Sequence, residues 1–166
     1  MSFIIDAKKI WKFGDNIDTD IIIPGRYLTL RNPNEMASHA FEPLNPNLGN
    51  NIEKGDIIVA GKNFGCGSSR EEAPFVLKVL GISAIIAESY ARIFYRNAIN
   101  LGLPLFELKD ASKIIKEGDK IQINVLKGIL EINGTNYKGT ALPEFLIDII
   151  KEGGATKAVK KRLGIV

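Results

Sequence analysis

The regular alternation of residues 56 to 108 constrains the fold more than any other feature of this sequence. Three short apolar runs typical of buried strands are separated by two segments whose apolar residues recur at helical spacing. Strands that alternate with single helices form βαβ units, whose strands are parallel and whose central strands are covered on both faces. The strand-like runs are "DIIVAGKNF", "ISAIIAES" and "LPLFEL", and the helical segments, each closed by a glycine, are "SREEAPFVLKVLG" and "YARIFYRNAINLG". This half of the chain is therefore predicted to be an α/β core.

The residues before this core have a less regular pattern. Residues 3 to 13 are strand-like, and the β-branched run from Ile21 to Ile23 predicts a short strand in a segment that is otherwise mostly loop. Asn32-Pro33 matches a helix N-cap with proline at the first helical position, which predicts a short helix over residues 34 to 40. The polar run "EPLNPNLGNN" follows, so we expect residues 27 to 51 to form surface structure.

After residue 110 the pattern changes again. The segment "GDKIQINVLKGILEINGTNYKG" alternates apolar and polar residues, with turn signals at Lys127-Gly128 and Asn133-Gly134. The segment "LPEFLIDIIKEGGATKAVKKRLG" that follows has a helical pattern. The C-terminal part is therefore predicted to add a β meander and one or two helices.

The length and composition of the chain indicate one globular domain. Its 166 residues are 45% hydrophobic and 25% charged, which is enough to bury a core, and there is no internal repeat. We therefore expect residues 1 to 166 to form a single domain. No segment approaches the ~18 to 20 apolar residues that would span a bilayer, and the N-terminus has no signal-peptide pattern, so we expect a cytoplasmic protein with no membrane partner.

Charge and cysteine content limit the partners and cofactors. The 22 basic and 19 acidic residues are spread along the chain, and the local basic excess near the end is typical of a solvated helix face rather than of nucleic-acid binding. Cys66 is the single cysteine, so this chain alone forms no disulfide and holds no cysteine-rich zinc site or iron–sulfur cluster. Any such metal must come with a partner. The basic residues near the end are Lys157, Lys160, Lys161 and Arg162.

The stretch "GKNFGCGSSREEAP", residues 61 to 74, runs from a predicted strand into a predicted helix. Local sequence leaves two interpretations of it open. In the first, Ser68 or Ser69 caps the helix and Glu71 or Glu72 completes a capping box. In the second, the glycine-rich backbone and the unpaired N–H groups of the helix N-terminus hold an anion.

Arg70 favours the second interpretation. A guanidinium beside a cluster of N–H groups makes a bidentate carboxylate site, and a hydroxyl in that field becomes a good base when deprotonated. The motif fits neither a Walker loop nor the dinucleotide fingerprint, whose third glycine would stand at Arg70. A serine–histidine hydrolase would need a Gly-x-Ser-x-Gly elbow, which the sequence lacks, so we expect the lone His39 on a helix surface.

Three other side chains near this chemistry are interpreted as structural or supporting. Cys66 lies between two glycines and is expected to be a small filler that packs under the turn. Asp18 and Asp20 flank a threonine ahead of an apolar run, a pattern more typical of capped backbone N–H groups than of metal ligands or bases.

Three blocks of this sequence resemble a known family. They are "DNIDTDIIIPGRYL" at residues 15 to 28, "GDIIVAGKNFGCGSSREEAP" at 55 to 74 and "SYARIFYRNAINLGLP" at 89 to 104. In their order and spacing they are similar to the small subunits of two-chain hydro-lyases of the aconitase superfamily, above all 3-isopropylmalate dehydratase, with homoaconitase and dimethylmalate dehydratase as close relatives. The tail beyond residue 110 fits in length but carries no motif.

The resemblance implies a fold, a reaction and a partner. The fold would be the three-layer β/β/α swivelling domain of aconitases, with a central, partly parallel sheet and a C-terminal β meander plus helices. The reaction would be the isomerisation of 2-isopropylmalate and 3-isopropylmalate by dehydration and rehydration in leucine biosynthesis. The partner would be a large subunit with a [4Fe-4S] cluster on three cysteines, joined to this chain in a heterodimer or heterotetramer, while this chain itself binds no cofactor.

The resemblance also implies roles for individual residues. In the family's Gly-Ser-Ser-Arg motif the first serine removes the proton next to a carboxylate, which gives that role to Ser68. Ser69 and Arg70 would bind and orient the carboxylate of a di- or tricarboxylate substrate. Asp20 becomes a supporting residue near the site.

Substrate choice in the family depends on the stretch that here contains Thr29 and Leu30. Homoaconitases tend to have an arginine at the position of Thr29, whereas an apolar residue such as Leu30 suits an alkyl group. The resemblance therefore favours isopropylmalate, followed by dimethylmalate or methylmalate. Arg31 is expected to be a solvated residue ahead of a helix, with pairing to a third carboxylate as the alternative. An alternative from a different class is a non-catalytic, anion-binding regulatory module.

Overall fold

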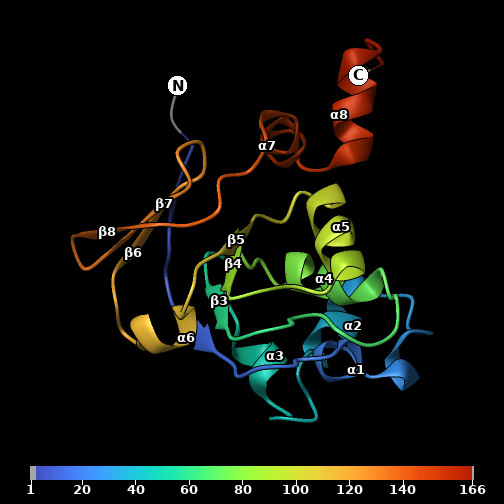
Figure 1. Ribbon diagram of the computed structural model, residues 1–166. Coiled ribbons are helices and arrows are strands. Elements are labelled where there is room, and N and C mark those ends of the chain that lie inside the picture. The colour runs from blue at the N-terminus through green and yellow to red at the C-terminus, as the bar shows by residue number, and fades with distance from the viewer. Residues whose placement is uncertain (1–2, 166) are drawn as a thin grey trace.

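The computed structural model describes residues 3–165 and contains, within that range, two four-stranded sheets. The parallel sheet lies between the antiparallel sheet and a layer of helices (Figure 1), which is the predicted three-layer α/β arrangement. The parallel sheet has the order β2-β3-β4-β5, with bounds Ile10–Lys12, Ile57–Ala60, Ala84–Ala87 and Leu105–Glu107. The antiparallel sheet has the order β1-β6-β7-β8, with bounds Ile4–Asp6, Ile121–Asn124, Ile129–Ile132 and Thr135–Lys138.

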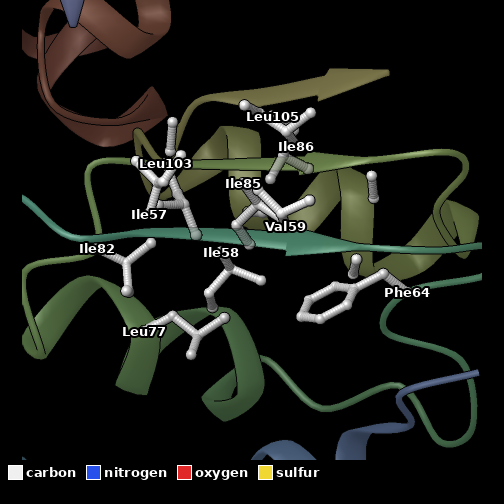
Figure 2. Close-up of a cluster of buried hydrophobic side chains, with 14 of the residues drawn as sticks. Ile57, Ile58, Val59, Phe64, Leu77, Ile82, Ile85, Ile86, Leu103 and Leu105 are labelled. Atoms are coloured by element: carbon white, nitrogen blue, oxygen red, sulfur yellow. The ribbon is translucent and has the colours of Figure 1, made fainter. Parts of the chain in front are cut away.

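The predicted α/β core is confirmed. Strands β3, β4 and β5 are parallel neighbours, joined through α4 (Glu72–Val79) and α5 (Arg92–Asn100). Every residue of β3 and β4 is buried, because these two strands lie inside the sheet and are covered on both faces. Figure 2 shows Ile58, Leu77 and Ile82 meeting between β3 and α4. The apolar residues that gave the sequence its helical and strand-like spacing therefore form the core.

The predicted C-terminal meander is confirmed as β6, β7 and β8. In β6, Ile121 and Ile123 are buried while Gln122 between them is exposed, which is the alternation that a half-buried strand requires. The turn between β7 and β8 is Asn133-Gly134, and both residues have positive φ angles, 50° and 85°. Asparagine and glycine tolerate this backbone better than other residues, so the hairpin forms where the sequence indicated it.

The expectation of a strand over residues 3 to 13 is wrong in part. This segment forms two strands that belong to different sheets: β1 pairs antiparallel with β6, and β2 pairs parallel with β3. Between them, the N–H of Ala7 donates to Ile121 O and the N–H of Lys8 donates to Gly55 O, both at 3.0 Å. The chain therefore crosses from one sheet to the other within residues 7 to 9.

The expected strand at Ile21–Ile23 is wrong as well. Residues Thr19–Ile22 form a short helix, α1, because Asp18 acts as its N-cap and accepts a hydrogen bond from the N–H of Ile21 at 2.9 Å. The side chains of Ile22 and Ile23 are fully buried. Burial in a helical turn, rather than strand pairing, therefore explains this β-branched run.

The segment 27 to 51 contains more helix and more buried side chains than we expected. The helix predicted after Asn32 is confirmed as α2 (Pro33–Ser38), and Asn32 caps it as predicted. The polar run after it also contains α3 (Leu48–Asn51), and the side chains of Phe41 and Leu48 are buried. Part of the predicted surface segment is therefore core, although Leu44 remains exposed.

The C-terminal helices pack on the outer side of α5 (Figure 1). They are α7 (Glu144–Lys151) and α8 (Ala155–Arg162), and the basic residues of α8 are exposed, as the sequence predicted. The short α6 (Ala111–Ile114), which the sequence analysis missed, packs on β3 and β4. Among the described residues, no helix is long and apolar enough to cross a membrane.

A buried carboxylate gives a first test of this packing. The side chain of Asp56 is 1% exposed, and its Oδ2 accepts hydrogen bonds from Trp11 Nε1 and from the N–H of Glu53, both at 2.8 Å. Replacing Asp56 by alanine would remove the acceptor of both partly buried donors, so we expect the free energy of unfolding to fall by about 1–3 kcal/mol. Urea unfolding followed by the fluorescence of Trp11 measures this difference.

The matched control for that experiment is Asp148→Ala, because Asp148 is exposed on α7. It should change the free energy of unfolding by no more than about 0.5 kcal/mol. Equal losses in the two variants would contradict the structural role of the Asp56 carboxylate.

Candidate active site

The glycine–serine turn lies at the carboxyl edge of the parallel sheet, where open α/β sheets usually bind ligands. It follows β3 and is joined on both sides to turns that follow the neighbouring strands. The N–H of Gly65 donates to Ile17 O at 2.7 Å, and the N–H of Thr19 donates to Cys66 O at 2.8 Å. On the other side the N–H of Ala91 donates to Phe64 O at 3.0 Å. The backbone of the turn is therefore fixed by both neighbours.

Packing against aromatic rings explains the first glycine of the motif. Gly65 has a φ of +82°, and a Cβ atom there would lie 2.1 Å from Cγ of Phe94. The ring of Phe94 in turn meets Phe64 edge-on, with centroids 5.2 Å apart. No side chain fits between this ring and the turn, so glycine is required by space as well as by backbone conformation.

The capping interpretation of the two serines is wrong. Helix α4 begins at Glu72 and its N-cap position is Glu71, with no side-chain cap. Ser68 and Ser69 lie before the helix and are exposed. Within residues 3–165, the N–H groups of Gly67, Ser68 and Ser69 donate to no backbone or side-chain acceptor. Hydroxyls and N–H groups at this turn are therefore available to a ligand.

A buried threonine, which the sequence analysis missed, lies directly under Ser68. Thr19 is 2% exposed, and its Oγ1 lies 3.1 Å from Ser68 O and 3.3 Å from Ser68 Oγ. The sequence signal was the Asp-Thr-Asp run, which was interpreted through its two acids and not through the threonine between them. Thr19 therefore holds the serine hydroxyl from below.

Arg70 is held on one edge of its guanidinium group. Its Nη1 donates to Ile23 O at 3.2 Å and forms an ion pair with Asp20 Oδ1, while its side chain remains 22% exposed. Gly25 lies against the other terminal nitrogen, since a Cβ atom there would be 3.3 Å from Nη2. The structure thus brings together the predicted residues Arg70 and Asp20 through α1.

Three further predictions about individual side chains have clear outcomes. Asp18 caps a helix, as expected. Cys66 is half-buried, and burial raises the pKa of its thiol, which agrees with a packing role and disfavours a reactive thiolate. His39 is not on a free helix surface: it is stacked on Tyr27 and bound to Glu42, and it makes no contact with Ser68. A serine–histidine pair is therefore excluded.

The predicted recognition residues lie in the segment that begins at Gly25, the glycine next to the guanidinium of Arg70. Thr29 is exposed and Leu30 is half-buried against the core, just after the short 3-10 helix η1 (Gly25–Tyr27). No hydrogen bond or ion pair of the described residues joins them to the glycine–serine turn. Arg31 is exposed. In the part of the chain that the structure covers, no cluster of three or more His, Cys, Asp or Glu side chains gathers as for a metal ion.

The fold and this turn define a class of protein. A family model described as the aconitase C-terminal domain matches residues 50–110, which include β3, the glycine–serine turn and α5. A crystal structure of a 3-isopropylmalate dehydratase from Methanocaldococcus jannaschii superimposes with a TM-score of 0.90 at 43% identity, covering 98% of this chain and 97% of that one.

Sequence comparison identifies the family within this class. The 3-isopropylmalate dehydratase small subunit of Caldicellulosiruptor bescii is 50% identical over 157 residues, which cover 93% of this chain and 95% of the relative. The isopropylmalate/citramalate isomerase small subunit of Methanocaldococcus jannaschii is also 50% identical over 157 residues, which cover 93% and 94%. This chain belongs to the family of 3-isopropylmalate dehydratase small subunits, which are subunits of a hydro-lyase.

The contact between Gly65 and Phe94 gives the second test. In Gly65→Ala the backbone would be strained by its positive φ angle, and the added methyl group would clash with Phe94. We therefore expect the free energy of unfolding to fall by about 2–4 kcal/mol. The control is Gly14→Ala, since a Cβ atom at Gly14 would meet nothing within 4 Å. Urea unfolding of both variants checks this, and a stable Gly65→Ala protein would contradict the described packing.

Proposed function

We propose that this chain is the small subunit of a two-chain hydro-lyase that isomerises 2-isopropylmalate and 3-isopropylmalate by dehydration and rehydration, a step of leucine biosynthesis. One observation carries the proposal: the exposed turn presents the Ser68 hydroxyl, unpaired N–H groups and the Arg70 guanidinium at the same edge of the sheet. These groups match a carboxylate and the carbon beside it, which is the part that all substrates of this family share. The relatives that are 50% identical in sequence to this chain are named as small subunits of such enzymes.

Ser68 is proposed as the base that removes the proton from the carbon next to the substrate carboxylate. A serine alkoxide is otherwise too unstable, and the nearby N–H groups and the charge of Arg70 would stabilise it. Thr19 contributes a hydroxyl 3.3 Å from Ser68 Oγ, which can donate to that oxygen when it is deprotonated. The same hydroxyl holds the base in position in the resting state.

Arg70 is proposed as the clamp for the substrate carboxylate, together with Ser69. Nη1 is already bound to Ile23 O and Asp20, so these two partners fix the plane of the guanidinium group. The remaining donors are free to bind a carboxylate with two parallel hydrogen bonds. Asp20 is thus a supporting residue, because it orients the arginine rather than binding the substrate.

The partner is proposed to be a large subunit that carries a [4Fe-4S] cluster, in a heterodimer or heterotetramer. The described residues of this chain offer no such site, and the single cysteine is half-buried with a raised pKa. When bound, the cluster would supply a Lewis acid for the substrate hydroxyl. The exposed groups of the turn would then form one half of an active site, closed by the partner.

The substrate is proposed to be an alkyl-substituted malate, with Thr29 and Leu30 facing the alkyl group. Thr29 offers no charge for a third carboxylate, which disfavours homoaconitase, although Arg31 nearby is exposed. Citramalate is a second candidate, because one half-identical relative is named as an isopropylmalate/citramalate isomerase. Dimethylmalate and methylmalate remain in the same class. The ultraviolet absorbance of the unsaturated intermediate, followed with each diacid and with homocitrate, ranks these substrates.

Substitutions in the assembled complex test the proposed roles. Ser68→Ala should lower kcat about 100- to 10,000-fold while KM changes little, because the base acts only on the reacting proton. Arg70→Lys should raise KM roughly 10- to 100-fold, because a lysine cannot make two parallel bonds. Steady-state kinetics measures both.

The control is Thr135→Ala, which removes an exposed hydroxyl from β8 and should leave both constants unchanged. Near-normal turnover by Ser68→Ala would show that another group is the base. An unchanged KM in Arg70→Lys would rule out bidentate binding.

A further inference from the structure

The segment from Gly25 to Arg31, which we call the recognition segment, is held in place by its side chains rather than its backbone. The hydrogen bonds of its own N–H groups that the structure describes are local: Tyr27 donates to Pro24 O, Leu28 to Gly25 O and Leu30 to Tyr27 O, at 3.0–3.2 Å. None of them reaches a strand or another helix. The position of Thr29 and Leu30 therefore depends on what the side chains of this segment bind.

A single carboxylate binds two of those side chains. Glu42 Oε1 accepts hydrogen bonds from Arg26 Nη2 at 2.5 Å and from Tyr27 Oη at 2.6 Å, while its Oε2 pairs with His39 Nδ1 at 2.7 Å. The rings of Tyr27 and His39 are stacked, with centroids 3.7 Å apart and planes at 7°. Glu42 thus ties the start of the recognition segment to the end of α2.

The turn that carries Glu42 is itself fixed to the core. Phe41 has a φ of +59°, which is unfavourable for a bulky residue and is maintained only where the surroundings enforce it. Its ring is fully buried and stacked on Phe13 with centroids 4.4 Å apart, and its N–H donates to Ile22 O at 3.0 Å. The carboxylate of Glu42 is therefore presented from a rigid support.

We infer that Glu42 is a positioning residue for substrate recognition, which fixes the recognition segment so that Thr29 and Leu30 meet the alkyl group of the substrate. The inference rests on the proposed function. Gly25 connects the two sites, because this first residue of the segment lies against the guanidinium of Arg70. Glu42 anchors the segment on one side, and the carboxylate clamp borders it on the other.

The three partners also keep Glu42 charged. Its hydrogen bonds with Tyr27, His39 and Arg26 lower the pKa of the carboxyl group from 4.5 to about 2. A lowered carboxyl pKa stabilises the folded state above the unfolded value of 4.5, and this contribution is lost as pH falls toward 2. The difference in unfolding free energy between wild type and Glu42→Gln should therefore shrink as the pH falls from 5 toward 2. Urea unfolding across this range checks the sign, and a difference that persists unchanged near pH 2 would contradict it.

Three measurements on Glu42→Gln test the inference. In the isolated chain, trypsin should cut after Arg26 and Arg31 several-fold faster, because the neutral amide no longer holds the segment. In the complex with the large subunit, KM for 2-isopropylmalate should rise about 3- to 10-fold with little change in kcat. The preference for 2-isopropylmalate over citramalate should fall, since the smaller methyl group makes fewer contacts with the segment.

Two further variants make the comparison specific. Glu35→Gln is the matched control, because Glu35 is an exposed glutamate on α2 outside the Glu42 contacts, and it should match wild type in every measurement. Tyr27→Phe keeps the stacked ring and removes one donor, so it should change cleavage and KM in the same direction as Glu42→Gln, but less. It also keeps the inference testable if Glu42→Gln does not fold.

The outcomes separate the inference from the proposed function. If the wild-type complex acted on neither diacid, the proposed function and the inference would both fail. If it acts on them, and Glu42→Gln leaves the preference unchanged or lowers kcat equally for both substrates, the inference alone is wrong. Faster cleavage without a change in preference would show a segment that is anchored by Glu42 but does not read the substrate.

Discussion

The junction of two irregular turns at the carboxyl edge of the parallel sheet is the constraint on which the site depends. Residues 17–19 and 64–66 exchange backbone hydrogen bonds outside any regular helix or strand pair. Because the junction involves backbone atoms, it leaves the hydroxyl of Ser68 and the donors of Arg70 free for other bonds. The aromatic rings beneath it supply the rigidity that a loop otherwise lacks.

The sheet and its helices could be predicted because their causes are local in the sequence. Strands buried on both faces need continuous apolar runs, and an Asn-Gly pair suits a backbone that few other residues adopt. The prediction for Ile21–Ile23 was wrong because one side-chain cap, from Asp18, outweighed the strand preference of three isoleucines. The run is buried, as its apolar character suggests, but most of it lies in a helix instead of a strand.

The candidate site was predictable only in part, for a related reason. The motif with Ser68 and Arg70 is contiguous, whereas Thr19 and Glu42 act through partners that are 49 and 15 or 16 residues away in sequence, respectively. Neither residue has a local pattern that distinguishes it from a turn residue. The capping interpretation failed similarly, because the turn that contacts residues 17–19 continues through both serines. Helix α4 therefore begins only at Glu72. Long-range contacts, not local preference, decide what these hydroxyls do.

The strand that begins the described chain has a consequence for the order of folding. β1 pairs with β6, so Ile4 lies opposite Asn124. During synthesis β1 emerges before the other described strands but has no partner until more than a hundred residues later, whereas the parallel sheet that carries the glycine–serine turn is complete once β5 has been made. The half that holds the chemistry can therefore assemble before the antiparallel sheet, and β1 pairs only after the parallel sheet is complete.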